Sequence, residues 1–371
     1  MAMVVLITLG SWIAVPSMPA SAQGATTGTR AITTVTEPDF PVGITFSTNI
    51  PLHDISFQSE DRVALNYQVS TDETLNLALV PRSAVIMQDG HLSISVFVDL
   101  QTSFVPPGVS LTYYWEISSQ DGTYTRSIPE STLWTDTRFD WEIHTSDQVT
   151  IYSYGMSEDF AQWMTDEAQA TIDDLESRYG IDQIEPLAIW VYPNSEDFSG
   201  TRQMNTREAI AGLSYPGASL IAAVVPNGNE REYGRVIPHE ISHQVVFHAT
   251  ENPFAFPPLW LDEGLATHYQ TGGTDHYPAM VQRAQAEGNL FDITSLNTSF
   301  PFQPAQASLA YASSWSIVGY IETTYGPEGI ALLLDAFAQG LPVDEAVTQA
   351  LGVSSQQLNH DWHQWVSDQN P

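Results

Sequence analysis

Two histidines four residues apart, His239 and His243, are the side chains of this sequence most suited to chemistry. They form the pattern His-Glu-x-x-His within an apolar stretch that favours a helix. Residues four apart lie on one helical face, one turn apart, so both imidazoles can bind a single Zn²⁺ at about 2.0–2.1 Å. Glu240 is offset from that face, which suits a general base that acts on a water without binding the metal. The motif predicts a zinc site; taken alone, its alternative is two surface histidines on a helix.

The segment Trp-Leu-Asp-Glu-Gly, residues 260–264, offers the ligand that the two histidines lack. A zinc site with two histidines needs a third protein ligand and one open position. Glu263 is separated from His243 by nineteen residues and follows a proline-rich loop. We therefore predict that Glu263 is the third ligand.

These two motifs, HEISH and WLDEG, resemble those of the gluzincin metallopeptidases, which include thermolysin and aminopeptidase N. Residues 139–371 as a whole are similar to the peptidase MA-like domains of exported bacterial proteins. The resemblance implies that His239, His243 and Glu263 bind Zn²⁺ and that Glu240 is the general base and acid. The spacer before Glu263 is one residue longer than in aminopeptidase N. The exopeptidase signature GxMEN is missing, which favours an endopeptidase over an aminopeptidase.

The same resemblance implies a downstream tyrosine or histidine that hydrogen-bonds the oxyanion of the tetrahedral intermediate. Tyr311 is our candidate for this catalytic role, and Tyr320 and Tyr325 compete with it. Such a donor stabilises charge that develops only in the transition state. A tyrosine at helical spacing is otherwise a core residue, and that alternative stays open for all three.

Other polar residues near the motif are weaker candidates. The metzincin pattern is excluded, because Val246 and Ala249 stand where it requires Gly and His. His248 is nine residues from His239 and faces away from it on a helix. Asp262 could orient a ligand imidazole or be a solvated helix residue. His268 is expected to be an ordinary polar residue rather than a ligand.

Two further features concern the surroundings of the motif. Residues 212–215 and 219–226 have the pattern of a hairpin, which could pair with extended substrate at a sheet edge or be plain sheet structure. Pro238 directly precedes His239. Inside a helix it would remove the hydrogen bond to the Gly234 carbonyl, whereas at a helix start it would be unremarkable.

The chain divides into three predicted regions: a signal peptide over 1–22, a β-sandwich domain over 23–136 and a gluzincin peptidase MA-like domain over 137–371. Apolar residues alternate with period two between about residues 40 and 135, as in strands with one buried face. The strands are expected at 63–69, 92–100, 111–117 and 123–128, and Asp121-Gly122 predicts a hairpin with a type I′ turn.

The pattern resembles immunoglobulin or fibronectin type III domains. A helix over 157–179, with Ser157 as its N-cap and Gly180 at its end, and a strand over 186–193 begin the second domain. Three or four short helices follow residue 300, and Gly326, Gly340 and Gly352 each end one of the apolar-periodic runs. The fold class is therefore α+β: an immunoglobulin/fibronectin-like β-sandwich, then a thermolysin-like zincin domain that ends in a helical bundle.

Composition limits the partners. The net charge is −33, all eleven basic residues are Arg, and 43% of residues are hydrophobic. A field of this sign repels phosphates and anionic lipid heads, so we expect a peptide or protein substrate, no nucleic acid and no stable membrane insertion after signal cleavage.

The N-terminus predicts export. An apolar run, Met3–Val15, precedes the cleavage signal Ala20-Ser21-Ala22, which is typical of a signal peptide. The segment has no basic residue, which leaves an uncleaved anchor or a misassigned start codon as alternatives. The chain has no Cys, so an exported form would rely on its core rather than on disulfides. A secreted or extracytoplasmic protein is therefore expected.

Three functions stay open from the sequence. The favoured one is a zinc metallopeptidase. The second is a binding or scaffold protein built on a degenerate peptidase fold. The third keeps the metal but cleaves another amide or processes one dedicated partner.

Overall fold

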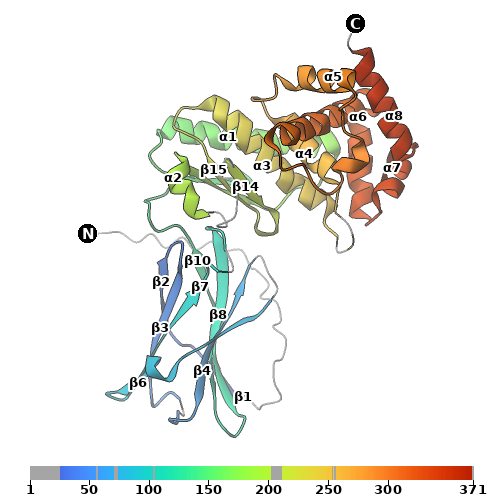
Figure 1. Ribbon diagram of the computed structural model, residues 1–371. Coiled ribbons are helices and arrows are strands. Elements are labelled where there is room, and N and C mark those ends of the chain that lie inside the picture. The colour runs from blue at the N-terminus through green and yellow to red at the C-terminus, as the bar shows by residue number, and fades with distance from the viewer. Residues whose placement is uncertain are drawn as a thin grey trace.

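The structure is a computed structural model that describes residues 26–55, 57–70, 74–102, 105–201, 211–252, 254 and 256–369. The predicted signal peptide lies outside this part. The described chain has a mixed α and β architecture: the strands of its first third form two sheets, a third sheet follows, and helices complete the C-terminal part (Figure 1).

Two sheets build the N-terminal part. One has the order β1-β9-β8-β4-β5, with β10 added to β8; its strands are β1 (Thr26–Arg30), β4 (Arg62–Val69), β5 (Asn76–Leu79), β8 (Val109–Ser118), β9 (Tyr124–Ser127) and β10 (Glu130–Trp134). The other has the order β2-β3-β7-β6; its strands are β2 (Thr34–Asp39), β3 (Gly43–Pro51), β6 (Val85–Gln88) and β7 (His91–Asp99). The predicted strands 63–69, 92–100, 111–117 and 123–128 correspond to β4, β7, β8 and β9.

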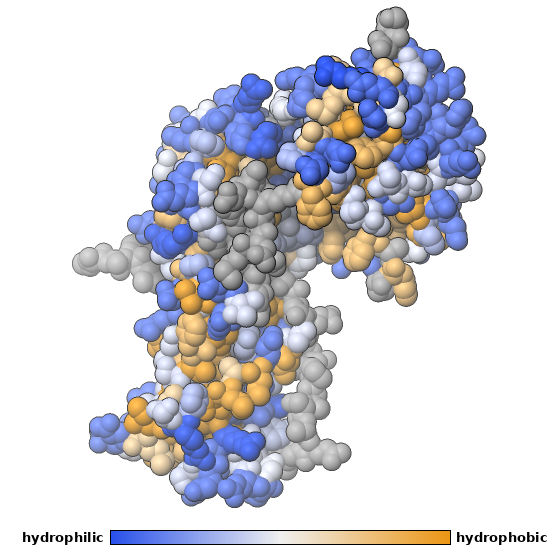
Figure 2. Space-filling model, in the orientation of Figure 1, coloured by the Kyte–Doolittle hydropathy of each residue, from blue (hydrophilic) through white to orange (hydrophobic). Residues whose placement is uncertain are grey.

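Alternation places one face of each sheet in a shared core. In β7 the side chains of Leu92, Ile94, Val96 and Val98 are buried, while most of their neighbours are exposed. The opposing β8 buries Trp115, among others. Period-two burial is the expected result of the strand pleat. Apolar side chains also gather on the visible outer face of these sheets, whereas the outer surface of the helices is largely hydrophilic (Figure 2).

The hairpin predicted at Asp121-Gly122 is confirmed, because β8 and β9 pair antiparallel around it. The predicted type I′ turn is wrong: only Gly122 has a positive φ (84°), and the Asp121 carboxylate instead accepts from the Thr123 amide at 2.9 Å. The geometry of a type I′ turn occurs at Asp89-Gly90, where both φ values are positive (52° and 77°) between β6 and β7. Sequence reasoning missed this second Asp-Gly signal.

The third sheet has the order β11-β12-β13-β15-β14, with strands β11 (Glu142–Thr145), β12 (Val149–Ser153), β13 (Leu187–Tyr192), β14 (Gly212–Tyr215) and β15 (Leu220–Val224). The three central strands are parallel, and β14 runs antiparallel at one edge. Every residue of β15 is buried, as expected for a parallel strand covered on both faces.

One face of this sheet is covered by α1 (Glu158–Tyr179) and α3 (Glu230–Thr250). The predicted caps of α1 are confirmed: the Ser157 hydroxyl accepts from the Phe160 amide, and Gly180 takes a left-handed conformation. The opposite face contributes Trp190, Tyr192 and other side chains to the core of the N-terminal sheets. One apolar core therefore spans the predicted boundary near residue 137.

The C-terminal part is helical, as predicted. It contains α4 (Leu259–Tyr269), α5 (Tyr277–Glu287), α6 (Pro304–Ala338), α7 (Val343–Leu351) and α8 (Ser355–Asp368), and the short α2 (Ser195–Phe198) lies earlier. Gly326 interrupts α6 with non-helical dihedrals (φ 73°, ψ 175°), at the predicted end of one helix. In the described ranges no helix has both the length and the apolar character needed to cross a membrane.

Candidate metal centre

The helix α3 carries both predicted histidine ligands on its cleft-facing side. The Nε2 atoms of His239 and His243 are 3.3 Å apart, as expected for side chains one turn apart on a helix. Pro238 lies inside this helix, not at its start. Because proline has no N–H, the Gly234 carbonyl is free, and it accepts a hydrogen bond from the Thr271 amide at 2.9 Å. This bond ties the chain after α4 to α3, beside the two histidines.

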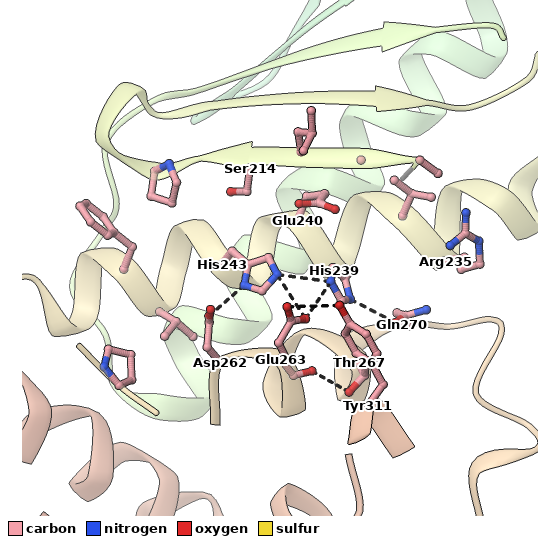
Figure 3. Close-up of a pocket in the computed structure, with 18 of the residues that line it drawn as sticks. Ser214, Arg235, His239, Glu240, His243, Asp262, Glu263, Thr267, Gln270 and Tyr311 are labelled. Carbon is pink, nitrogen blue, oxygen red and sulfur yellow. Dashed lines mark hydrogen bonds and ion pairs between the residues drawn. The ribbon is translucent and has the colours of Figure 1, made fainter. Parts of the chain in front are cut away.

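Helix α4 brings Glu263 to the histidines. Its Oε2 atom is 3.4 Å from His239 Nε2 and 3.8 Å from His243 Nε2 (Figure 3). A tetrahedral zinc site with bonds of about 2.0–2.1 Å has ligand atoms about 3.3–3.4 Å apart. The triangle formed by the three atoms therefore has nearly the dimensions of one face of such a site.

The Oε2 atom of Glu263 is buried and has no hydrogen-bond donor among the described residues. A buried carboxylate oxygen without a donor is costly unless something else compensates its charge. Among the His, Asp and Glu side chains of the described chain, those of His239, His243 and Glu263 have ligand atoms close enough together to hold one metal ion. Nitrogen and oxygen donors in this number fit Zn²⁺ and leave one position open.

The second nitrogen of each histidine has a defined partner. His243 Nδ1 is 2.8 Å from Asp262 Oδ1, and His239 Nδ1 is 3.1 Å from Gln270 Oε1. An acceptor at Nδ1 fixes the imidazole tautomer and leaves the Nε2 lone pair for a metal. Of the two readings of Asp262, the structure favours orientation of a ligand. Gln270 was missed, because it lies just after the end of α4 and only the fold brings it to α3.

Electrostatics separate the roles of the two glutamates. Burial raises the pKa of Glu240. The charges of His239 and His243 act to lower it, and the carboxylates of Glu263 and Asp262 raise it by a smaller effect. Burial also acts to raise the pKa of Glu263, but His239, whose Nε2 lies 3.4 Å away, and the charge of His243 lower it below its ordinary value. Glu263 thus stays an anion that can bind a cation, while Glu240 is held in a setting that favours taking up a proton.

Burial acts to lower the pKa of His243, but Asp262 and the two glutamates outweigh burial and raise it to about 10. A metal must displace that proton, because only a neutral imidazole binds it. Metal affinity at this site should therefore increase with pH.

Glu240 lies between α3 and the edge strand β14. Its side chain is buried, with 8% of the residue exposed, and Gly212 of β14 approaches it so closely that a Cβ atom there would be 2.6 Å from Glu240 Oε1. A side chain at this point of the strand would therefore displace Glu240 or Val236. Further along, Gln244 donates to the Ser214 hydroxyl at 2.7 Å, which fixes β14 along α3.

Of the three candidate tyrosines, Tyr311 alone lines the cleft around these residues within the described chain. Its hydroxyl donates to Glu263 Oε1 at 3.4 Å, and burial together with the Glu263 charge raises its pKa. Tyr320 and Tyr325 instead pack against one another, with ring centroids 6.3 Å apart.

The two remaining histidine candidates do not reach the centre. His268 Nε2 is 3.1 Å from Glu322 of α6, and neither His268 nor His248 belongs to the lining of the cleft. The expectation that they are not metal ligands agrees with this arrangement.

The cleft has a volume of about 1300 Å³, and its described lining extends to both sides of the three candidate ligands. β14 and α3 form one wall, and α4 and α6 form the other (Figure 3). Lining residues on the side toward the N-terminus of α3 are Arg235, Gln270, Gly273 and Tyr277; those on the side toward its C-terminus include Val246, Phe247, Phe256 and Pro257. The space is large enough for several residues of an extended peptide.

A zinc-type site in an open cleft on a mixed α and β scaffold defines a class, the zincin-like peptidases. The family model described as the Peptidase MA superfamily matches residues 167–368, more than half of the chain, so the chain belongs to this superfamily. No curated protein sequence matches it. Among solved structures, an aminopeptidase N family protein from Idiomarina loihiensis is similar at 10% identity with a TM-score of 0.41; the similarity covers 86% of this chain and 73% of that one.

Proposed function

We propose that this chain is a secreted, zinc-dependent metallopeptidase of the gluzincin type. One observation carries the proposal: three ligand atoms of His239, His243 and Glu263 lie 3.3–3.8 Å apart, with Glu240 buried beside them in an open cleft. Membership of the Peptidase MA superfamily agrees with peptidase activity.

Zinc, when bound by these three side chains, would supply the Lewis acidity that polarises the scissile carbonyl and acidifies the attacking water. Glu240 takes the proton of that water and delivers it to the leaving amine, for which its raised pKa is suited. Tyr311 donates its hydroxyl hydrogen to the oxyanion of the tetrahedral intermediate. Asp262 and Gln270 hold the two imidazoles in the orientation that this chemistry needs.

The substrate is an extended peptide that adds to the outer edge of β14, which pairs with no further strand in the described part of the chain, in the β-addition mode of recognition. An endopeptidase is favoured over an aminopeptidase, because the described lining of the cleft continues on both sides of the metal ligands. The N-terminal sheets then form an immunoglobulin/fibronectin-like β-sandwich that positions the catalytic domain. The N-terminal apolar segment and the small-residue cleavage signal support secretion.

The test compares the mature protein with its Glu240→Gln variant. Metal content is measured by mass spectrometry, and hydrolysis is measured on casein and on a peptide library. We expect one zinc per chain in both proteins and hydrolysis only in the first. Zinc without hydrolysis in either protein would favour the binding or narrowly dedicated alternative, and a protein that takes up no zinc would refute the site assignment.

A further inference from the structure

Arg235 is the basic side chain closest to the metal ligands on α3. It lies one turn before His239, and it is the single Arg or Lys among the described residues that line the cleft. The chain has 44 acidic and 11 basic residues, so most of its surface repels anions. A guanidinium inside the cleft therefore gives this end of it a cationic donor that the rest of the described cleft lining lacks.

The guanidinium is held in place from two sides. Its Nε and Nη2 atoms donate to the two carboxylate oxygens of Glu232, at 3.0 Å for Nε. Its Cγ and Cδ atoms pack beside Gly273, where a Cβ atom would be 3.3 Å away. The ion pair with Glu232 uses the Nε and Nη2 edge of the guanidinium, and the N–H groups of Nη1 have no acceptor within the described ranges. A guanidinium held in this way can bind a second carboxylate without a large loss of side-chain entropy.

The direction of a bound peptide follows from β14. Gly212 lies against Val236 and Glu240, and Ser214 lies against Gln244, so β14 and α3 run in the same sense (Figure 3). Antiparallel pairing is the more stable way to add a strand. A peptide paired antiparallel to β14 therefore has its C-terminal half directed toward Arg235.

The reach of Arg235 sets the position that it can recognise. One helical turn separates it from His239, about 6 Å along the axis, which equals about two residues of an extended strand. The opposite end of the cleft is lined by apolar side chains such as Val246 and Phe256 and by the acidic Glu251. The two ends of the cleft thus differ in charge: one carries a guanidinium and the other a carboxylate.

We propose that Arg235 binds a carboxylate on the first or second residue after the scissile bond, either an acidic side chain or the terminal carboxylate of a short peptide. This substrate class rests on the proposed peptidase function. Arg235 acts in specificity and takes no part in bond cleavage.

The experiment uses an alanine-based quenched decapeptide with Phe-Leu at its centre, whose cleavage site is assigned by mass spectrometry. In one set of peptides, Glu or Gln stands at one of the two positions after the scissile bond or at one of the two before it. In a second set, the peptide ends at the first or second position after the scissile bond, either as the free acid or as the amide. Each is cleaved by the zinc-loaded wild type, by Arg235→Met and by Arg231→Met. Arg231 is an exposed residue of the same helix outside the cleft lining, so its removal is a matched change of net charge.

We expect the wild type to favour Glu over Gln, or acid over amide, by about tenfold in kcat/KM after the scissile bond, as for one charge-assisted hydrogen bond near the surface. Arg235→Met should bring that ratio close to one, and Arg231→Met should keep it. The Glu/Gln and acid/amide pairs distinguish a side-chain carboxylate from a terminal one. A wild type without preference, a preference before the scissile bond, or a ratio that survives Arg235→Met would overturn the proposal.

A binding measurement separates this proposal from the proposed function. The same peptide pairs are titrated calorimetrically into zinc-loaded Glu240→Gln protein and into its Arg235→Met derivative. A carboxylate preference in Kd that depends on Arg235 would support the inference even if no peptide is hydrolysed, in which case only the peptidase proposal fails. Equal affinities for carboxylate and amide peptides would refute carboxylate recognition even if hydrolysis is observed.

Discussion

Gly264, which directly follows the candidate ligand Glu263, lies where α4 crosses α6. A Cβ atom at this position would be 2.7 Å from the Ser314 carbonyl oxygen and 2.7 Å from Val318 Cγ2. Ordinary van der Waals contacts begin at 3.4 Å, so Gly264→Ala requires a displacement of about 0.7 Å. The Ser314 carbonyl belongs to the backbone of α6, which cannot give way as a flexible side chain would.

The magnitude follows from two opposing terms. An extra methyl group in a packed interior costs about 1–3 kcal/mol. Replacing a glycine in the middle of a helix by alanine contributes about 1 kcal/mol in the stabilising direction. Gly319 in α6 supplies a matched control, because the nearest atom to its Cβ position is His268 Cε1 at 3.9 Å. The helix term is common to both variants, so their difference isolates the overpacking at Gly264.

We expect Gly319→Ala to stabilise the protein by about 0.5–1 kcal/mol and Gly264→Ala to destabilise it by up to about 2 kcal/mol. For a folding unit of 150–250 residues, a difference of about 2 kcal/mol corresponds to about 4–8 °C in the unfolding midpoint. Calorimetric scans in a metal chelator give the midpoints without a contribution from metal binding. Gly264→Ala should also lower zinc affinity, because Glu263 moves with α4. Equal midpoints for the two variants would refute the close-packing argument.

Three further outcomes are expected. Asp262→Ala should weaken zinc binding about 10–100-fold, because His243 loses its acceptor; competition with a chelator of known affinity measures this, and unchanged affinity would contradict the orienting role. Tyr311→Phe should keep its zinc and lose about 10²-fold in kcat, and a kcat within twofold of the wild type would exclude oxyanion stabilisation by this hydroxyl. Burial acts to raise the pKa of Glu322, but hydrogen bonds from His268, Arg178 and Tyr179 lower it to about 2 from its ordinary 4.5. The depressed pKa gives stability that is present above pH 4.5 and lost as the pH falls toward 2, so Glu322→Gln should flatten that limb of the midpoint-against-pH curve.

The features that the sequence predicted correctly are local ones. The alternation in β7 and the caps of α1 each depend on residues within a few positions of one another, and both are present as expected. The histidines of the motif belong to this group, because helical spacing alone brings His239 and His243 together. The type I′ turn failed because the Asp121 side chain bonds the local backbone, which gives the dipeptide a second conformation.

The features that could not be predicted depend on contacts between distant segments. Gln270 reaches the site only because the residues that follow α4 pack on α3. The close approach of Gly212 to Glu240, which is 28 positions away in the chain, likewise comes only from the fold. The core shared by the N-terminal sheets and the third sheet likewise joins residues such as Trp115 and Trp190, which no local pattern relates.

Pro238 shows how a local defect can organise a site. The sequence left open whether it begins a helix or interrupts one, and the structure has it inside α3, directly before His239, the first candidate ligand. Its missing N–H frees the Gly234 carbonyl, and that carbonyl binds the Thr271 amide at 2.9 Å. The neighbouring Gln270 then accepts from His239 at 3.1 Å. A residue that costs α3 one hydrogen bond thus provides the anchor for the loop that holds the His239 imidazole, a candidate metal ligand, which explains why a helix-breaking residue can stand at this position.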